Sequence, residues 1–260
     1  MTTTDTAGTT ATRTTGPASR PDRQWWALGR LQVADALRGL TVTALVTLAV
    51  LGVMALVARW QGWDVVVMDE VEWSGPPLLV EGGRTILWVS LVVLPISVGI
   101  AAVVHAVLAT ARTRVHVASG ATRWQVVLAH LLTVAAMTVY VLVVALVVLL
   151  LLGSGPGGAV EILGSETAGG PVPAVVAAVG ATVGPMMAAV TITAMFLRWP
   201  WWVGTGVLVG FFVVLPMVAG LLPAVGEALD RADAWWGSDL LVAVVLTGVF
   251  VGIMRRVPVK

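Results

Sequence analysis

Six apolar stretches decide more than any other feature what this chain can fold into. They contain no Asp, Glu, Lys or Arg, and they cover residues 40–58, 86–108, 126–152, 172–197, 201–222 and 240–254. A helix needs about 20 mostly apolar residues to cross the hydrocarbon core of a bilayer. Five stretches approach or exceed that length, and the sixth does so only if residues 235–239 lengthen it. The pattern predicts an all-α integral membrane protein with six transmembrane helices.

The composition agrees with this prediction. The chain of 260 residues is 58% hydrophobic and 11% charged, whereas soluble domains carry roughly 25% charged residues. The absence of cysteine excludes disulfides, thiolate metal sites and a cysteine nucleophile. Fourteen arginines stand against one lysine, a bias typical of high-GC bacterial genes, so we expect a multi-pass protein of the bacterial cytoplasmic membrane.

The basic residues predict the orientation, because cytoplasmic loops are enriched in Lys and Arg. With the N-terminus inside, the inner segments hold 12 of the 15 cations: Arg13, Arg20, Arg23, Arg30, Arg38, Arg112, Arg114, Arg123, Arg198, Arg255, Arg256 and Lys260. The outer loops hold the other three cations and eleven carboxylates. The twelve tryptophans fall near span edges, where indole rings favour the headgroup level. Both termini are therefore expected in the cytoplasm.

Two segments precede the first span. Residues 1–22 are Thr-rich with few large apolar side chains, which predicts a disordered cytoplasmic tail and no signal peptide. In residues 23–39, an apolar arc that includes Trp25 and Trp26 excludes Gln32, Asp35 and Arg38. This arc favours an amphipathic helix in the inner interface, and the alternative is an extension of the first span. Residues 40–256 then form the transmembrane domain, and 257–260 form a second cytoplasmic tail.

The spans exclude several kinds of chemistry. A charge at mid-membrane marks proton relays, ion paths and voltage sensors, so its absence argues against ion-coupled carriers, pumps and voltage-gated channels. His105, His116 and His130 lack the spacing of metal ligands, and we expect them to make polar contacts near the inner interface. No HExxH, GxSxG or phosphate-loop motif is present. We therefore expect no enzyme activity, metal or bound ATP in this chain.

Small residues and prolines mark the helix contacts and bends that we expect. Glycine pairs at four-residue spacing permit close helix approach in lipid, and they occur at Gly180/Gly184, Gly206/Gly210 and Gly248/Gly252. Prolines within or just after the spans free backbone carbonyls and kink helices, which can serve a gate but is also common in static membrane helices. These prolines are Pro95, Pro185, Pro216 and Pro223.

The most specific segment joins the second and third spans, with the sequence RTRVHVASGATRWQVVLAHLL over residues 112–132. Gly120 permits a sharp bend, and either Ser119 or Thr122 is placed to cap the helix that follows. The positive-inside rule alone would explain the arginines. It does not explain why the turn leads directly into a helix that begins with Trp124 and Gln125.

This segment resembles the permease subunits of ATP-binding cassette transporters of the type-2 export class. In that family, the loop between the second and third spans forms a short coupling helix against the ATPase subunit, which residues 109–125 match here. Short re-entrant helices lie between the fifth and sixth spans of the family, and residues 215–238 resemble that region. The resemblance covers about residues 24–256.

The resemblance implies a site and partners. The contact that transmits ATPase movement would comprise Arg112, Arg114, His116, Ser119, Gly120, Ala121, Thr122, Arg123 and Trp124, braced by Trp25, Trp26 and Arg30. This chain would pair with a second copy or a similar permease subunit and with two ATPase subunits that bind ATP and Mg. It would itself bind no cofactor or nucleic acid, and it would contact membrane lipid. It would export substrate by alternating access.

Two other classes of function stay open. A secondary carrier or substrate-binding membrane component would work without an ATPase, but it should show inverted repeats and polar residues at mid-membrane, which this sequence lacks. A membrane anchor or regulator would recruit a partner through its Thr-rich tail or acidic outer loops. A neighbouring gene for a phosphate-loop ATPase would favour the permease, and its absence would favour the others.

Overall fold

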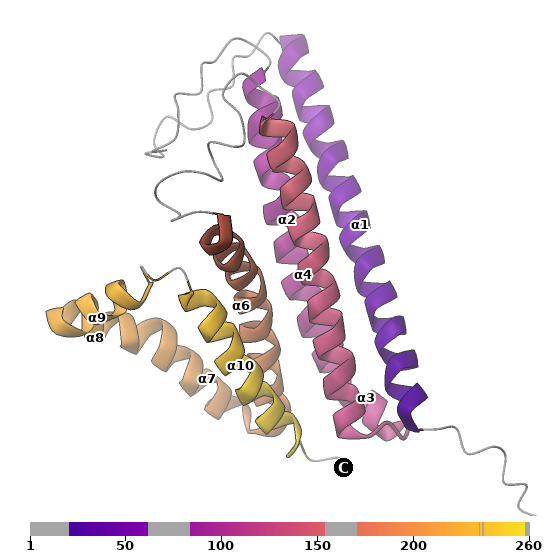
Figure 1. Cartoon of the computed structure of the whole chain (residues 1–260), viewed down its shortest axis with the longest axis vertical. Coiled ribbons are helices and arrows are strands. Elements are labelled where there is room, and N and C mark those ends of the chain that lie inside the picture. The colour runs from indigo at the N-terminus through magenta and orange to yellow at the C-terminus, as the bar shows by residue number, and fades with distance from the viewer. Residues whose placement is uncertain (1–20, 62–83, 154–170, 234, 236, 258–260) are drawn as a thin grey trace, which may run out of the picture.

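The computed structural model describes residues 21–233, 235 and 237–257, apart from the gaps at 62–83 and 154–170. In these ranges the regular structure is entirely helical, which confirms the predicted all-α class (Figure 1). The elements are α1 (Pro21–Gln61), α2 (Arg84–Ala111), α3 (Thr113–Ala118), α4 (Arg123–Gly153), α6 (Pro171–Arg198), α7 (Trp201–Val209), the π-helix η2 (Gly210–Val214), α8 (Leu215–Leu221), α9 (Pro223–Asp233) and α10 (Ser238–Met254). The predicted N-terminal tail lies largely outside the described residues, as do residues 258–260 of the C-terminal tail.

Five helical segments are long and apolar enough to cross a membrane: Trp25–Val57, Val93–Ala118, Arg123–Val148, Val172–Arg198 and Trp201–Leu221. Helix α10 is equally apolar but has 17 residues. Large apolar side chains face outward along these helices, and in α1 Leu45, Met54 and Leu56 are all more than 60% exposed. Such a surface is costly in water and suits contact with lipid tails. The helices therefore indicate a membrane-embedded protein.

The helices form two groups that meet at one end of the molecule. Helices α1, α2 and α4 pack against one another as the first group, and α10 packs mainly against α6, which with α7 makes the second group. Helix α6 also contacts α2 and α4. In Figure 1 the two groups lie close at the end that bears α3 and diverge toward the other end. We call the end where they meet the α3 end.

The core contains apolar side chains from both groups, including Leu40, Val98, Met137, Met186 and Phe250. Buried hydroxyls within it are satisfied locally: Thr110, Thr133 and Thr138 each donate to the backbone carbonyl four residues earlier. This pairing is what an apolar environment demands, since an unpaired polar group in hydrocarbon costs several kcal/mol.

The structure shows no break between the predicted interfacial helix and the first span. Residues 23–39 are helical, but they continue without a break into the rest of α1. A single buried stripe crosses the predicted boundary, through Gly29, Gln32, Ala36, Leu40 and Ala44. Because Gln32 belongs to this stripe, the face that the sequence assigned as polar is in part the packed face. The interfacial position of residues 23–39 stays a prediction.

The segment after the fifth span is broken into short helices. The π-helix η2 interrupts the predicted fifth span, and Leu222 has an extended backbone (φ −118°, ψ 95°) between α8 and α9. Pro223 is the first residue of α9, where a missing N–H costs no hydrogen bond. Pro216 lies directly after η2 inside the continuous helical run Trp201–Leu221, where proline removes one helical hydrogen bond. Pro95 and Pro185 lie inside α2 and α6, and both helices continue past them.

Candidate functional site

The short helix α3 ends in a tight turn centred on Gly120. The Gly120 N–H donates to the Val117 carbonyl and the Ala121 N–H to the His116 carbonyl, each at 3.1 Å. This pair of bonds is a Schellman motif, which needs a left-handed residue at the position of Gly120. Gly120 has φ +97°, a conformation that costs a non-glycine residue about 1 kcal/mol. The predicted bend is therefore present, and it stops α3 after six residues.

The start of α4 is closed by a capping box. The Gln125 N–H donates to the Thr122 Oγ1 at 3.3 Å, and the Thr122 N–H donates to the Gln125 Oε1 at 2.9 Å. Ser119 instead donates its hydroxyl back to the His116 carbonyl at 2.8 Å. Of the two candidate caps, Thr122 is the one used. The Thr-x-x-Gln spacing is itself a sequence signature of such a box, and it identifies Gln125 as a residue that the sequence analysis left without a role.

The three arginines of this segment each contact a different helix. Arg112 pairs with Asp35 of α1 at 3.0 Å, although both side chains are about 60% exposed. Arg114 donates to the backbone carbonyl of Leu197 in α6 at 2.7 Å. Arg123 donates to the carbonyl of Arg255, directly after α10, at 3.1 Å. The sequence predicted these arginines as site residues without indicating their partners.

A buried polar cluster lies just behind the turn. The imidazole of His130 is 2% exposed, and its Nε2 lies 3.0 Å from the Thr113 hydroxyl. Its Nδ1 lies 3.1 Å from Oε1 of Gln32, so one side chain joins α1, α3 and α4. The Gln32 Nε2 is buried without a partner among the described residues. A polar contact was the expected role of this histidine, and the structure confirms it.

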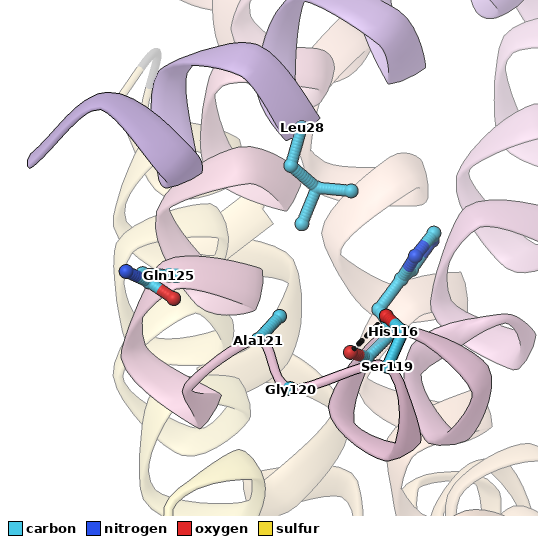
Figure 2. Close-up of a pocket in the computed structure, with 6 residues that line it drawn as sticks. All are labelled: Leu28, His116, Ser119, Gly120, Ala121 and Gln125. Carbon is cyan, nitrogen blue, oxygen red and sulfur yellow. Dashed lines mark hydrogen bonds between the residues drawn. The ribbon is translucent and has the colours of Figure 1, made fainter. Parts of the chain in front are cut away.

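A small cavity opens beside the turn, with a volume of about 160 Å³. Figure 2 shows Leu28 pointing from α1 toward the turn, with the other lining residues below it. The lining consists of Leu28, His116, Ser119, Gly120, Ala121 and Gln125. Since a water molecule occupies about 30 Å³ of liquid, the cavity has room for a few waters or one partner side chain.

Other residues of the segment face outward. Val115 on α3 is 67% exposed and Trp124 is 48% exposed. The guanidinium of Arg255 lies 5.4 Å from the centre of the Trp124 ring. The exposed surface of the segment thus includes two large apolar side chains beside its exposed arginines, Arg112, Arg114 and Arg123.

Trp25, Trp26 and Arg30 are the residues predicted to brace the turn from α1, and this role stays a prediction. Trp25 and Trp26 contact each other, with ring centres 5.6 Å apart, and Arg30 is exposed. Other residues of α1 lie at this segment: Leu28 lines the cavity, Gln32 bonds His130, and Asp35 pairs with Arg112. Asp35 is the one carboxylate of the sequence between residues 23 and 63, and that isolation was an available signal.

The predicted packing glycines differ from one another. A Cβ at Gly180 would lie 2.6 Å from the Leu240 nitrogen, so this glycine permits the close approach of α6 and α10, whereas at Gly184 the nearest atom would be 3.8 Å away. In the described part of the chain, nothing lies within 4 Å of a Cβ built at the others, which are Gly206, Gly210, Gly248 and Gly252. Tight contacts occur instead at Gly29, Gly39 and Gly204.

No metal site is evident among the residues that the structure describes, where no three His, Asp or Glu side chains come together. Comparisons of the chain with models of protein families, with curated proteins and with solved structures found no match. Support for a function therefore comes from the geometry of the turn and from the resemblance of its sequence.

Proposed function

We propose that this chain is the permease subunit of an ATP-binding cassette transporter of the type-2 export class. One observation carries the proposal: the six-residue helix α3 and its turn lie between two apolar helices at the end where the arginines gather. A coupling helix needs that position. The sequence resemblance of residues 109–125 to the family's coupling loop supports the same assignment.

The local structure suits a part that transmits movement. The Schellman motif fixes the end of α3, and the capping box fixes the start of α4. A turn fixed at both ends moves as a rigid unit when a partner displaces it, instead of deforming locally. Its exposed face, with Val115 and Trp124, is available to another protein.

Under this proposal the chain is half of the membrane part and performs no chemistry. Two such halves, either two copies or one copy and a similar subunit, pair with two ATPase subunits that hold ATP and Mg. Closure of the ATPases then rocks the halves between inward-open and outward-open states. The chain has six spans, with α10 as a short sixth, and both termini lie in the cytoplasm of a bacterium.

The proposal is tested by purifying the tagged chain from its native membrane in mild detergent. We expect a stoichiometric phosphate-loop ATPase to co-purify and to hydrolyse ATP. Because the chain has no cysteine, a single Val115→Cys substitution offers a unique cross-linking site, and it should link to that ATPase. Leu229→Cys in α9 is the matched control and should not. A chain that purifies alone with no ATP turnover would refute the proposal.

A further inference from the structure

The contacts of Arg112, Arg114 and Arg123 extend from one short segment to three separate helices. They end at Asp35 of α1, at Leu197 of α6 and at Arg255 after α10. The first of these helices belongs to the first group, and the other two belong to the second group. The segment therefore bridges both groups at the end where they meet.

Two of the contacts close the ends of helices. The last carbonyls of a helix have no partner within it, and Leu197 lies in the last turn of α6 while Arg255 follows α10. A guanidinium placed there satisfies an open carbonyl and also meets the negative end of the helix dipole. Arg114 and Arg123 thus act as C-terminal caps supplied by a different part of the chain.

The need for positive charge on one side of a membrane does not explain these contacts. Arg30, Arg38 and Arg256 lie at the same end and are exposed. Within the described residues none of these three side chains makes a hydrogen bond or an ion pair, whereas the side chains of all three arginines of the segment reach a partner. The two sets of arginines carry the same charge, so charge alone does not explain why one set makes contacts. What differs is where each arginine lies in the fold.

We propose that the turn is a joint, in which Arg112, Arg114 and Arg123 are positioning residues that fasten α1 at Asp35 and the C-terminal ends of α6 and α10 to α3 and the start of α4. A displacement of α3 then moves the ends of both helix groups together. The two groups diverge away from this end (Figure 1), so a small movement at the joint is enlarged at the far end. The joint requires no partner protein, so it is tested on the purified chain alone.

The test measures distances between spin labels on cysteines placed in the cysteine-free chain. Leu31→Cys on α1 and Val249→Cys on α10 report the separation of the two groups, and both sites are exposed. We expect one narrow distribution in the parent and a second, longer population after Arg114→Gln and Arg123→Gln. Each lost contact should raise the longer population about two- to fivefold. That factor corresponds to the free energy typical of an exposed charge contact or of a charge at a helix end.

Three controls make the result specific. A label pair within the first group, Leu31→Cys with Val139→Cys, should keep its distribution in the glutamine variants. Arg38→Gln, which removes an arginine without a described contact, should leave both distances unchanged. Lysine at residues 114 and 123 retains a charged donor and should restore much of the parent distribution. Identical distributions in parent, glutamine and lysine variants would overturn the joint.

A charge swap tests the third contact and remains informative if the glutamine variants do not fold. Arg112→Asp alone should broaden the distance between labels at Leu31 and Val115, and Asp35→Arg in the same chain should narrow it again. Failure of the swap to restore the distance would show that this pair does not position α1. Neither result depends on an ATPase, so failure of the joint leaves the proposed permease function open.

Discussion

Gly39 of α1 lies directly against the imidazole of His105 in α2, so that a Cβ at residue 39 would overlap the ring. By contrast, Gly52 in the same helix has nothing within 4 Å. The two glycines therefore form a matched pair for testing how α1 packs. The first permits a close helix contact, and the second has no such role within the described chain.

Gly39→Ala should lower the thermal stability of the detergent-solubilised chain, because overpacking costs about 1–3 kcal/mol. Gly52→Ala should be neutral or stabilising by up to about 1 kcal/mol, since alanine is the better helix former. Fluorescence-detected size exclusion after heating measures both variants. His105→Ala should partly rescue Gly39→Ala by removing the ring. Equal melting of the two glycine variants would contradict the contact.

Gly120→Pro should destroy the turn, because proline fixes φ near −65° and residue 120 has φ +97°. Gly120→Asn is the matched variant, since asparagine adopts the left-handed conformation more readily than other side chains. Under the proposed function, the proline variant should insert normally but lose ATPase co-purification and transport, whereas the asparagine variant should keep both. Normal function of the proline variant would contradict the coupling role of the turn.

Thr122→Ala should destabilise the first turn of α4 by about 1 kcal/mol, because it removes the capping hydroxyl. Thr122→Ser keeps that hydroxyl and should have little effect. The backbone amide of Gln125 donates to Thr122 Oγ1, so its hydrogen exchange measures the effect. In Thr122→Ala its protection factor should be about fivefold lower than in the parent. If Ser119→Ala accelerated this exchange as much as Thr122→Ala, the assignment of the cap would be wrong.

His130→Leu should be among the most damaging substitutions at the α3 end. It leaves the Thr113 hydroxyl and the Gln32 amide buried without their observed partner, and each unsatisfied buried group costs about 1–3 kcal/mol. His116→Leu is the matched control at a partly exposed site and should be tolerated better. Thermal unfolding in detergent compares them, and a His116 variant that melts first would contradict the buried cluster.

The predicted orientation is tested by labelling cysteines in intact cells. Leu229→Cys in α9 should react with a membrane-impermeant maleimide from outside, and Val115→Cys in α3 should react only after permeabilisation. Both side chains are at least 40% exposed, and the chain has no other cysteine to react. Reaction of Val115→Cys in intact cells would reverse the proposed topology.

The positions of the helices were predictable because they depend on local properties of the chain. The apolar stretches at 86–108, 126–152 and 172–197 are helical in α2, α4 and α6, and these helices extend no more than a few residues further. Glycine and proline likewise marked the turn at Gly120 and the short helix that begins at Pro223. The length of a segment, its hydrophobicity and its backbone preference each depend only on residues that are neighbours in the sequence, so they can be predicted from it.

The contacts between helices depended on the tertiary structure. Which face of α1 is buried follows from its packing, and for that reason Gln32 lies inside while the amphipathic pattern placed it outside. The partners of Arg114 and Arg123 are backbone carbonyls. Every residue has such a carbonyl, so no residue type in the sequence marks these two as partners. Gly180 packs closely while Gly248 does not, although both belong to the same spacing pattern. The sequence alone therefore determined the helices and the turn that joins two of them. Only the folded chain decided which surfaces meet, because packing depends on residues far apart in the sequence.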